Sequence, residues 1–152
     1  MTTRVGHEQK LYYNTGTNAS PTWVLVKRAI DVSVPFAKGR ADVSRRESKW
    51  KKERGAQIEL GLEFGYLYRT GTDTVWAALL DSALNGTPIE FAVMDGLIAT
   101  SGSRGWRAYY EVMDFPTEEN LVDSKKYNVT CAHTDKEESS TLIEPTMYTV
   151  PA

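Results

Sequence analysis

The segment QIELGLEFGYLY, residues 57–68, alternates between two kinds of side chain, and this alternation decides the fold class. The even-numbered positions from 58 to 68 are all aliphatic or aromatic. The odd-numbered positions from 57 to 65 hold glutamine, glutamate and glycine. A period of two held this long indicates a strand with one face in a core. Glycine weakens a strand, so the two glycines on the polar face indicate a close approach or a bend. The side chains that we expect to point into the core are Ile58, Leu60, Leu62 and Phe64.

Shorter alternating runs on both sides of this segment predict further strands. Residues 23–34 are interpreted as one half-buried strand, bulged near Arg28 and ended by Pro35. Residues 135–140 are acidic and polar, which favours a linker. Residues 135–152 are thus interpreted as this linker followed by a C-terminal segment. The remaining expected strands are residues 10–14, 89–94, 106–115, 121–133 and a short one at 148–150.

One helix is expected, at residues 73–84. Thr72 or Asp73 can cap its start, and Asn85-Gly86 supplies a left-handed terminator. Strands with a single helix predict a mainly β, α+β domain: two packed antiparallel sheets or a partly closed barrel, with the helix on its flank. The apolar stripe that should pack on a sheet comprises Val75, Trp76, Leu79, Leu80, Ala83 and Leu84.

Length and composition indicate one domain, residues 1–152, with no apolar run long enough for a membrane span. Residues 1–11 are too polar for a signal peptide, so we expect folding in a cytoplasm and no membrane insertion. A lone Cys131 excludes an internal disulfide, and one cysteine with two histidines cannot frame a metal site. We therefore expect neither a metal nor another cofactor.

Charge is strongly uneven along the chain. Residues 38–54 carry eight cations and three acidic residues, a net charge of +5. Because the whole chain has a net charge of −2, the remaining residues carry a net charge of −7. Residues 37–55 show no period of either kind, which predicts a long surface loop, either functional or merely solvated. The residues of interest in this loop are Lys38, Arg40, Asp42, Arg45, Arg46, Lys49, Trp50, Lys51, Lys52 and Arg54.

Enzyme signatures are weak. Nucleophile-elbow, P-loop, zinc-protease and dinucleotide-binding motifs are absent from the sequence. Cys131 and His133 share one face of an expected strand, but no third residue is evident to orient them. A nucleic-acid-binding module that uses the basic loop and Trp50 is a second hypothesis, since cations and an aromatic ring can hold a single strand.

Several segments together resemble the phage major tail tube proteins, in their small single-domain siphophage and prophage form. These are RVGHE at residues 4–8 with KLYY at 10–13, then DV at 31–32 with KGRADVSRR at 38–46. The most specific block is LNGTPIEFAVMDG at 84–96, followed by GSRG at 102–105. The resemblance runs along nearly the whole chain, and it departs at residues 50–54 and 135–145.

This resemblance implies a non-enzymatic virion protein that forms six-membered rings stacked into a tail tube. It implies a conduit for genome DNA and, earlier, for the tape-measure protein, with tail-end proteins as further partners and assembly in the host cytoplasm. A tube of a related secretion system is an open alternative. The resemblance also implies that the basic loop reaches neighbouring subunits and rings. We expect the ring to close by strand pairing between neighbouring copies, through residues 106–115 or 121–133. The residues expected to face the lumen are Gln57, Glu59, Gly61, Glu63 and Gly65, because an acidic, smooth wall does not bind phosphate.

Overall fold

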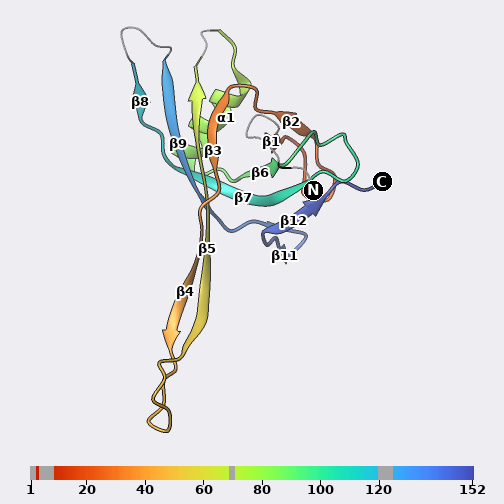
Figure 1. Cartoon of the computed structure of the whole chain (residues 1–152). Helices are drawn as coiled ribbons and strands as arrows, with labels where there is room; N and C mark the ends of the chain where they lie inside the picture. Colours follow the sequence, from red (N-terminus) through yellow and green to blue (C-terminus); the bar gives the residue numbers. More distant parts are fainter. Residues whose placement is uncertain (1–2, 4–8, 69–70, 120–124) are drawn as a thin grey trace.

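A computed structural model describes residue 3 and residues 9–68, 71–119 and 125–152 (Figure 1). The N-terminal motif at residues 4–8 and the start of the strand expected at 121–133 lie outside the described residues. The elements are β1 (Lys10–Asn14), β2 (Trp23–Leu25), β3 (Ala29–Ser33), β4 (Phe36–Asp42), β5 (Glu53–Leu67), α1 (Thr74–Asn85), β6 (Ile89–Met94), β7 (Arg104–Asp114), β8 (Thr117–Glu118), β9 (Lys126–His133), β10 (Glu137–Glu138), β11 (Thr141–Leu142) and β12 (Thr146–Thr149).

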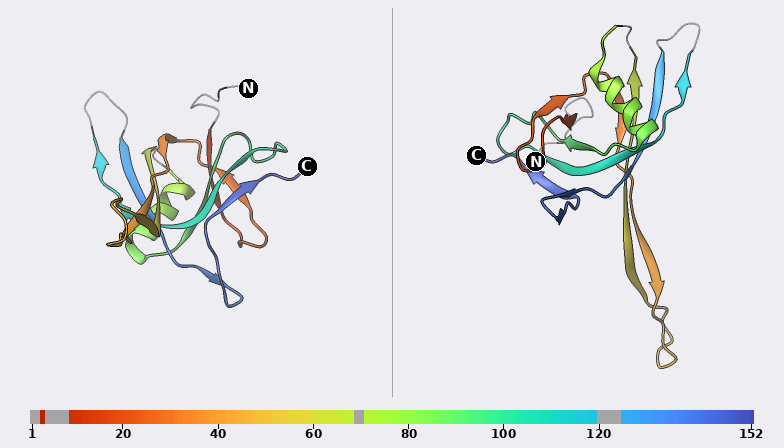
Figure 2. Two further views of the ribbon diagram at one scale, coloured as in Figure 1. Left: turned by 60° about the horizontal axis from the view of Figure 1, so that its bottom comes forward. Right: turned by 180° about the vertical axis from the view of Figure 1, so that it is seen from behind.

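The main sheet is antiparallel and runs in the order β2-β1-β6-β7-β9-β5-β3, with β12 added to β7 and β8 to β9. Its two outermost strands, β2 and β3, are separated in the chain by only residues 26–28. The sheet must therefore curl until these edges approach one another, as Figure 2 shows. No strand ladder among the described residues joins β2 to β3, so the barrel is partly closed rather than complete.

The core fills the concave side of this sheet, where α1 packs. Asp73 caps the helix by accepting a hydrogen bond from the Trp76 N–H at 3.1 Å, and Gly86 ends it in the left-handed region at φ 71°. Leu79 is buried as expected, but Ala83 and Leu84 are exposed, which corrects the predicted stripe. Ser82 is buried in their place because its Oγ accepts a hydrogen bond from the Val112 N–H of β7 at 3.1 Å.

The basic segment is a β-hairpin rather than a loop. β4 pairs with the first half of β5, and only residues 43–52 connect the two strands. In Figure 1 this hairpin leaves the body as a long two-stranded projection, which we call the arm (residues 36–60). Ile58 lies on the arm beyond the core and is 56% exposed, so its predicted burial is wrong, whereas Leu60, Leu62 and Phe64 are buried.

Two other expectations about strands are also wrong. Residues 23–34 form two strands, because the chain turns at 26–28 and its halves pair with β1 and β5 respectively. Residues 135–140 are not a featureless linker, since β10 and β11 pair as a small hairpin. The expected short strand near the C-terminus is present as β12.

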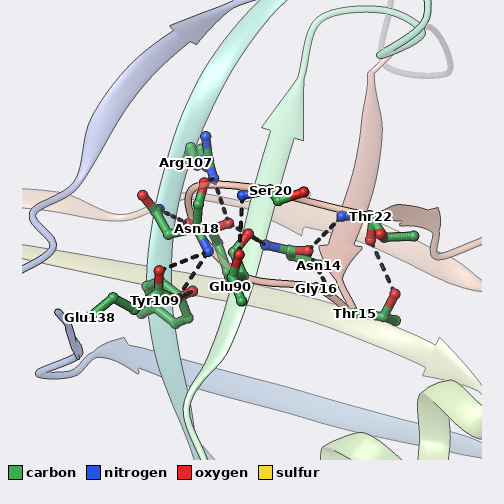
Figure 3. Close-up of polar contacts among 11 residues, drawn as sticks. Asn14, Thr15, Gly16, Asn18, Ser20, Thr22, Glu90, Arg107, Tyr109 and Glu138 are labelled. Atoms are coloured by element: carbon green, nitrogen blue, oxygen red, sulfur yellow. Dashed lines mark hydrogen bonds and ion pairs between the residues drawn. The ribbon is translucent and has the colours of Figure 1, made fainter.

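A buried ionic network fixes this C-terminal hairpin and the loop after β1 onto the outside of the sheet (Figure 3). Glu90 is 1% exposed and pairs with Arg107 at 3.1 Å, while Asn14 and Asn18 donate to its two oxygens at 2.8 and 2.6 Å. Glu138 accepts hydrogen bonds from the Asn18 N–H at 3.0 Å and the Tyr109 hydroxyl at 3.2 Å. Because each carboxylate bridges different segments, the network positions both segments against β6 and β7.

Within the described residues, no helix is long and apolar enough to span a membrane.

Candidate functional site: the outer sheet face and the arm

The exposed face of β5 continues as an acidic surface over two neighbouring strands. Glu63 lies opposite Thr130 of β9, and Thr130 lies opposite Asp114 of β7, so the three residues form one row across the sheet. Glu63 and Asp114 are both exposed, as is Glu59 farther along β5. Cross-strand partners share a face, so this row places two carboxylates on the outer face with a neutral side chain between them.

A second row extends the same surface toward the arm. Gly61 pairs with Ala132, and Ala132 pairs with Glu111 of β7. Glu111 and Asp114 were not among the predicted site residues. In the sequence Glu111 falls on the outward parity of residues 106–115, but Asp114 falls on the opposite one. Asp114 joins the same surface only because the register between β7 and β9 shifts between Val112 and Asp114.

The two glycines on this face allow close approach rather than leaving an open, smooth wall. A Cβ at Gly61 would lie 2.9 Å from Pro35 Cγ, where the chain crosses from β3 to β4. Gly65 is buried, and a Cβ there would lie 2.6 Å from Lys126 Cε and 2.8 Å from Ile30 Cγ1. The predicted role of these glycines in smoothing the face is therefore corrected, while the close approach is confirmed.

The arm carries the basic side chains on an ordered scaffold. At its tip, Asp42 accepts a hydrogen bond from the Ser44 N–H at 2.8 Å, and the hydrogen bonds from Ser44 hold the pKa of that carboxyl below its usual range. The Lys52 N–H donates to Ser44 Oγ at 3.0 Å, which ties the two sides of the connection together. Glu53 accepts ion pairs from Lys51 at 2.9 Å and Arg40 at 3.6 Å. Trp50 is 79% exposed.

Most of the other predicted arm residues point into solvent. The exposed ones are Lys38, Arg45, Arg46, Lys49, Lys52 and Arg54, and Gln57 is exposed on the same projection. The basic segment and the acidic residues of β5, which are neighbours in the sequence, therefore form two separate surfaces. The acidic face (Glu59, Glu63, Glu111 and Asp114) lies on the outer side of the sheet, and the cations lie along the arm.

Both strands predicted to close a ring by edge pairing are interior strands. β9 is paired with β5 on one side and with β7 and β8 on the other, and β7 is paired with β6, β9 and β12. Their backbone groups are already engaged over most of their length. This prediction about residues 106–115 and 121–133 is therefore wrong for the strands that it named.

Cys131 and His133 do not form an activated pair. Cys131 is buried, and this burial raises the pKa of its thiol to about 12, which keeps it protonated at neutral pH. His133 Nδ1 instead lies 2.9 Å from the Tyr109 carbonyl oxygen. In the part of the chain that the structure describes, no group of three or more His, Cys, Asp or Glu side chains could hold a metal ion.

No protein-family model and no curated protein matches the sequence. Among solved structures, the SPP1 tail tube protein superposes with a TM-score of 0.74 at 11% identity, over 99% of this chain and 81% of that chain. The chain has the tail tube fold. A chain of the native gene transfer agent virion gives a TM-score of 0.69 at 10% identity, over 96% of this chain and 99% of that one. A chain in the tail of the empty gene transfer agent particle, refined with C6 symmetry, gives 0.67 at 14% identity over 87% and 95%.

The likeness to the SPP1 tail tube protein concerns the backbone of the whole chain. The similarity covers the arm, the curved sheet and α1 together, since 99% of this chain is aligned with the SPP1 protein. At 11% identity the shared feature is the backbone architecture, and the charges on each surface belong to this chain. The residues that carry function must therefore be argued from their own placement.

Proposed function

We propose that this protein is the structural subunit of a tail tube, which self-assembles into stacked hexameric rings and forms the conduit for genome DNA. The observation that carries the proposal is the near-complete superposition on the SPP1 tail tube protein at a TM-score of 0.74. The protein acts without catalysis, in a virion tail assembled in the host cytoplasm. Its partners are further copies of itself, the tape-measure protein, tail-end proteins and DNA in transit.

The acidic face is the proposed wall of the lumen. Its carboxylates Glu59, Glu63, Glu111 and Asp114 are not ion-paired with any described cation. Unpaired carboxylates repel DNA phosphates, and a repulsive wall keeps DNA from binding at every ring as it passes. The proposal thus keeps Gln57, Glu59 and Glu63 of the expected lumen residues, leaves out Gly61 and Gly65, which lie against Pro35 and Ile30, and adds Glu111 and Asp114 of β7.

The arm is the proposed contact between successive rings. It projects well beyond the body (Figure 1), and the segment that connects its two strands, residues 43–52, carries the exposed Trp50 among cations. An isolated two-stranded ribbon is only marginally stable in water, and its edges carry unpaired backbone groups. The length of the arm therefore supports a role in binding another molecule. Cations steer it toward acidic surface of another copy, and Trp50 supplies a candidate buried anchor.

Negative-stain electron microscopy of the purified protein tests the proposal. We expect rings or tubes with sixfold symmetry, at protein concentrations where unrelated domains of this size stay dispersed. Purely monomeric particles over a range of concentration and salt would overturn it. A tube of a related secretion system would also form rings, and the partner proteins recovered with the tubes from the native host distinguish the two.

A second candidate function, nucleic-acid binding through the arm, is favoured by the cations around the exposed Trp50. It predicts that the monomer binds single-stranded DNA, with an affinity that falls steeply as salt rises. A gel-shift titration tests this directly. Tight, salt-dependent binding that Trp50→Ala abolishes would support it over a role between rings.

A further inference from the structure

The C-terminal hairpin, which β10 and β11 form, presents one side to the sheet and the other to solvent. Lys136 and Glu138 face the sheet, because the Lys136 ammonium lies 5.7 Å from the Tyr109 ring centroid and Glu138 accepts the hydrogen bond of the Tyr109 hydroxyl. Glu137 lies between them in the strand, so its side chain is on the opposite side. Leu142 is the cross-strand partner of Glu137 and shares that outward side, where it is 48% exposed.

The turn of this hairpin has a backbone conformation that its sequence does not favour. Ser139 and Ser140 lie in the left-handed region, at φ 51° and 63°. Two-residue turns of this kind normally hold asparagine and glycine. Strained backbone persists where the surrounding structure holds it, and it gathers at sites that bind other molecules. Here Glu138 holds the hairpin to the body by accepting the Asn18 N–H at 3.0 Å, so the outward side is already formed in the free chain.

The hairpin and the residues that flank it are acidic. Residues 135–144 contain four acidic residues and one lysine, a net charge of −3. The side chains of Asp135, Glu137 and Glu144 are exposed. None of the three is ion-paired with a described residue, so their charge is available to a partner.

The segment that connects the two strands of the arm, which we call the arm end (residues 43–52), has the complementary character. It contains five cations and one acidic residue, a net charge of +4. Val43 is 41% exposed and Trp50 79%. Arg45 and Arg46 are exposed and are not ion-paired with a described residue. Tryptophan and arginine are the residues that most often dominate the binding energy of protein interfaces.

We infer that the arm end of one copy binds the C-terminal hairpin of another copy. Trp50 packs against Leu142 in this contact, and the cations of the arm end lie against the exposed carboxylates of the hairpin. The two segments have net charges of +4 and −3, and each exposes a large apolar side chain. Opposite charge steers and orients association, while apolar burial holds the complex.

One copy cannot make this contact with itself. Phe36, at the base of the arm, stacks on Trp106, whose cross-strand partner Met147 belongs to the strand that follows the hairpin. From this base β4 runs outward to Asp42, a distance of about 20 Å at roughly 3.3 Å per residue. Figures 1 and 2 show the arm end well apart from the C-terminal hairpin of the same chain.

The contact is therefore heterologous, and a heterologous contact can repeat from copy to copy without closing. Such repetition suits the stacking of one ring on the next. The inference rests on the proposed function for the identity of the partner, a second copy of this chain. It goes beyond the proposed function by naming the surface that receives the arm.

Charge reversal tests the inference, with the amount of pelletable polymer as the measurement. Variant A carries Arg45→Glu with Arg46→Glu, and variant B carries Glu137→Lys with Glu144→Lys. Each variant alone brings like charges together, so we expect pelletable polymer to fall by about tenfold or more relative to the unmodified chain. Variant AB carries all four substitutions and opposes the charges again. We therefore expect variant AB to recover polymer.

A matched control separates the hairpin from the acidic face and from an effect of net charge. Variant AC adds Glu59→Lys with Glu63→Lys to variant A. It has the same net charge as variant AB, but its hairpin is unmodified. We expect variant AC to stay as deficient in polymer as variant A, and circular dichroism checks that every variant is folded.

Three results would overturn the inference: normal polymer from variant A or B, a folded variant AB that does not recover, or recovery of variant AC to the level of variant AB. Failure of the unmodified protein to polymerise would instead overturn the proposed function, so the two failures are distinguishable.

Discussion

At the scale of single residues, Gly105 shows how one missing side chain allows two strands to pair. It lies opposite Met94 in the β6–β7 ladder, and a Cβ at this position would overlap the Val93 carbonyl oxygen and the Met94 backbone. Backbone atoms inside a sheet cannot move aside without breaking the ladder. We expect Gly105→Ala to lower the midpoint of thermal unfolding by several degrees or to prevent folding.

Gly55→Ala is the matched control for this prediction. Gly55 also lies in a strand, but the atoms that an added Cβ would meet belong to the flexible end of the Lys38 side chain. That end can rotate away at little cost, so we expect no measurable change in the unfolding midpoint. Equal effects of the two substitutions in a thermal melt would contradict the argument from close backbone approach.

Glu90 is a buried charged residue whose ion pair supports the fold. Its carboxylate is fully buried, and Arg107, which faces it, is only 13% exposed in its side chain. Glu90→Ala leaves the Arg107 guanidinium buried without its counter-charge. We expect a loss of about 3–5 kcal/mol in the free energy of unfolding, measured by urea denaturation. Glu63→Ala, at an exposed glutamate of the same sheet, should leave the urea midpoint nearly unchanged.

At the scale of elements, the arm is an independent projection on a completed body. Its distal part contributes no buried residue, because burial along β5 begins at Leu60. Ala37 and Glu59 are cross-strand partners, so replacing residues 38–58 by Asn-Gly should close a short hairpin at that pair. We expect the shortened protein to keep its unfolding midpoint within a few degrees and to form no tubes in negative stain.

Salt gives an independent check on the same element. The Debye length shortens from about 10 Å at 0.1 M to about 3 Å at 1 M ionic strength. The attraction between the cationic arm and acidic surfaces therefore weakens as salt increases. We expect assembly of the intact protein, followed by light scattering, to slow as salt increases. Normal tubes from the shortened protein would show that the arm is dispensable and only decorates the surface.

At the scale of the whole molecule, the acidic face predicts how an assembled tube treats DNA. Substituting Glu59→Lys together with Glu63→Lys changes exposed side chains only, so the fold and the tubes should persist. Each ring would then offer cations to phosphate, and weak contacts repeated over many rings add up. We expect the variant tubes to retain duplex DNA in a salt-sensitive manner and, in particles, to slow genome ejection. Unchanged retention and ejection would contradict a repulsive wall.

The sequence alone determined most of what depends on neighbours in the chain. The alternation at residues 57–68 predicted the second half of β5, and the capping residues Asp73 and Gly86 bounded the only described α-helix. The resemblance to tail tube proteins predicted a fold that structural comparison confirms at a TM-score of 0.74. These predictions succeeded because side-chain period and capping are local properties, set within a few residues.

Tertiary structure alone decided which segments pair and what each face touches. Residues 37–55 lack periodicity because an arm exposed on both faces needs no apolar face, so a pattern of burial could not identify its strands. The break at residues 26–28 follows from curling of the sheet, and the burial of Glu90 follows from partners up to 76 residues away. The acidic face arises likewise from the register between distant strands. Such long-range pairings depend on the energy of the whole fold, and no local pattern in the sequence encodes them.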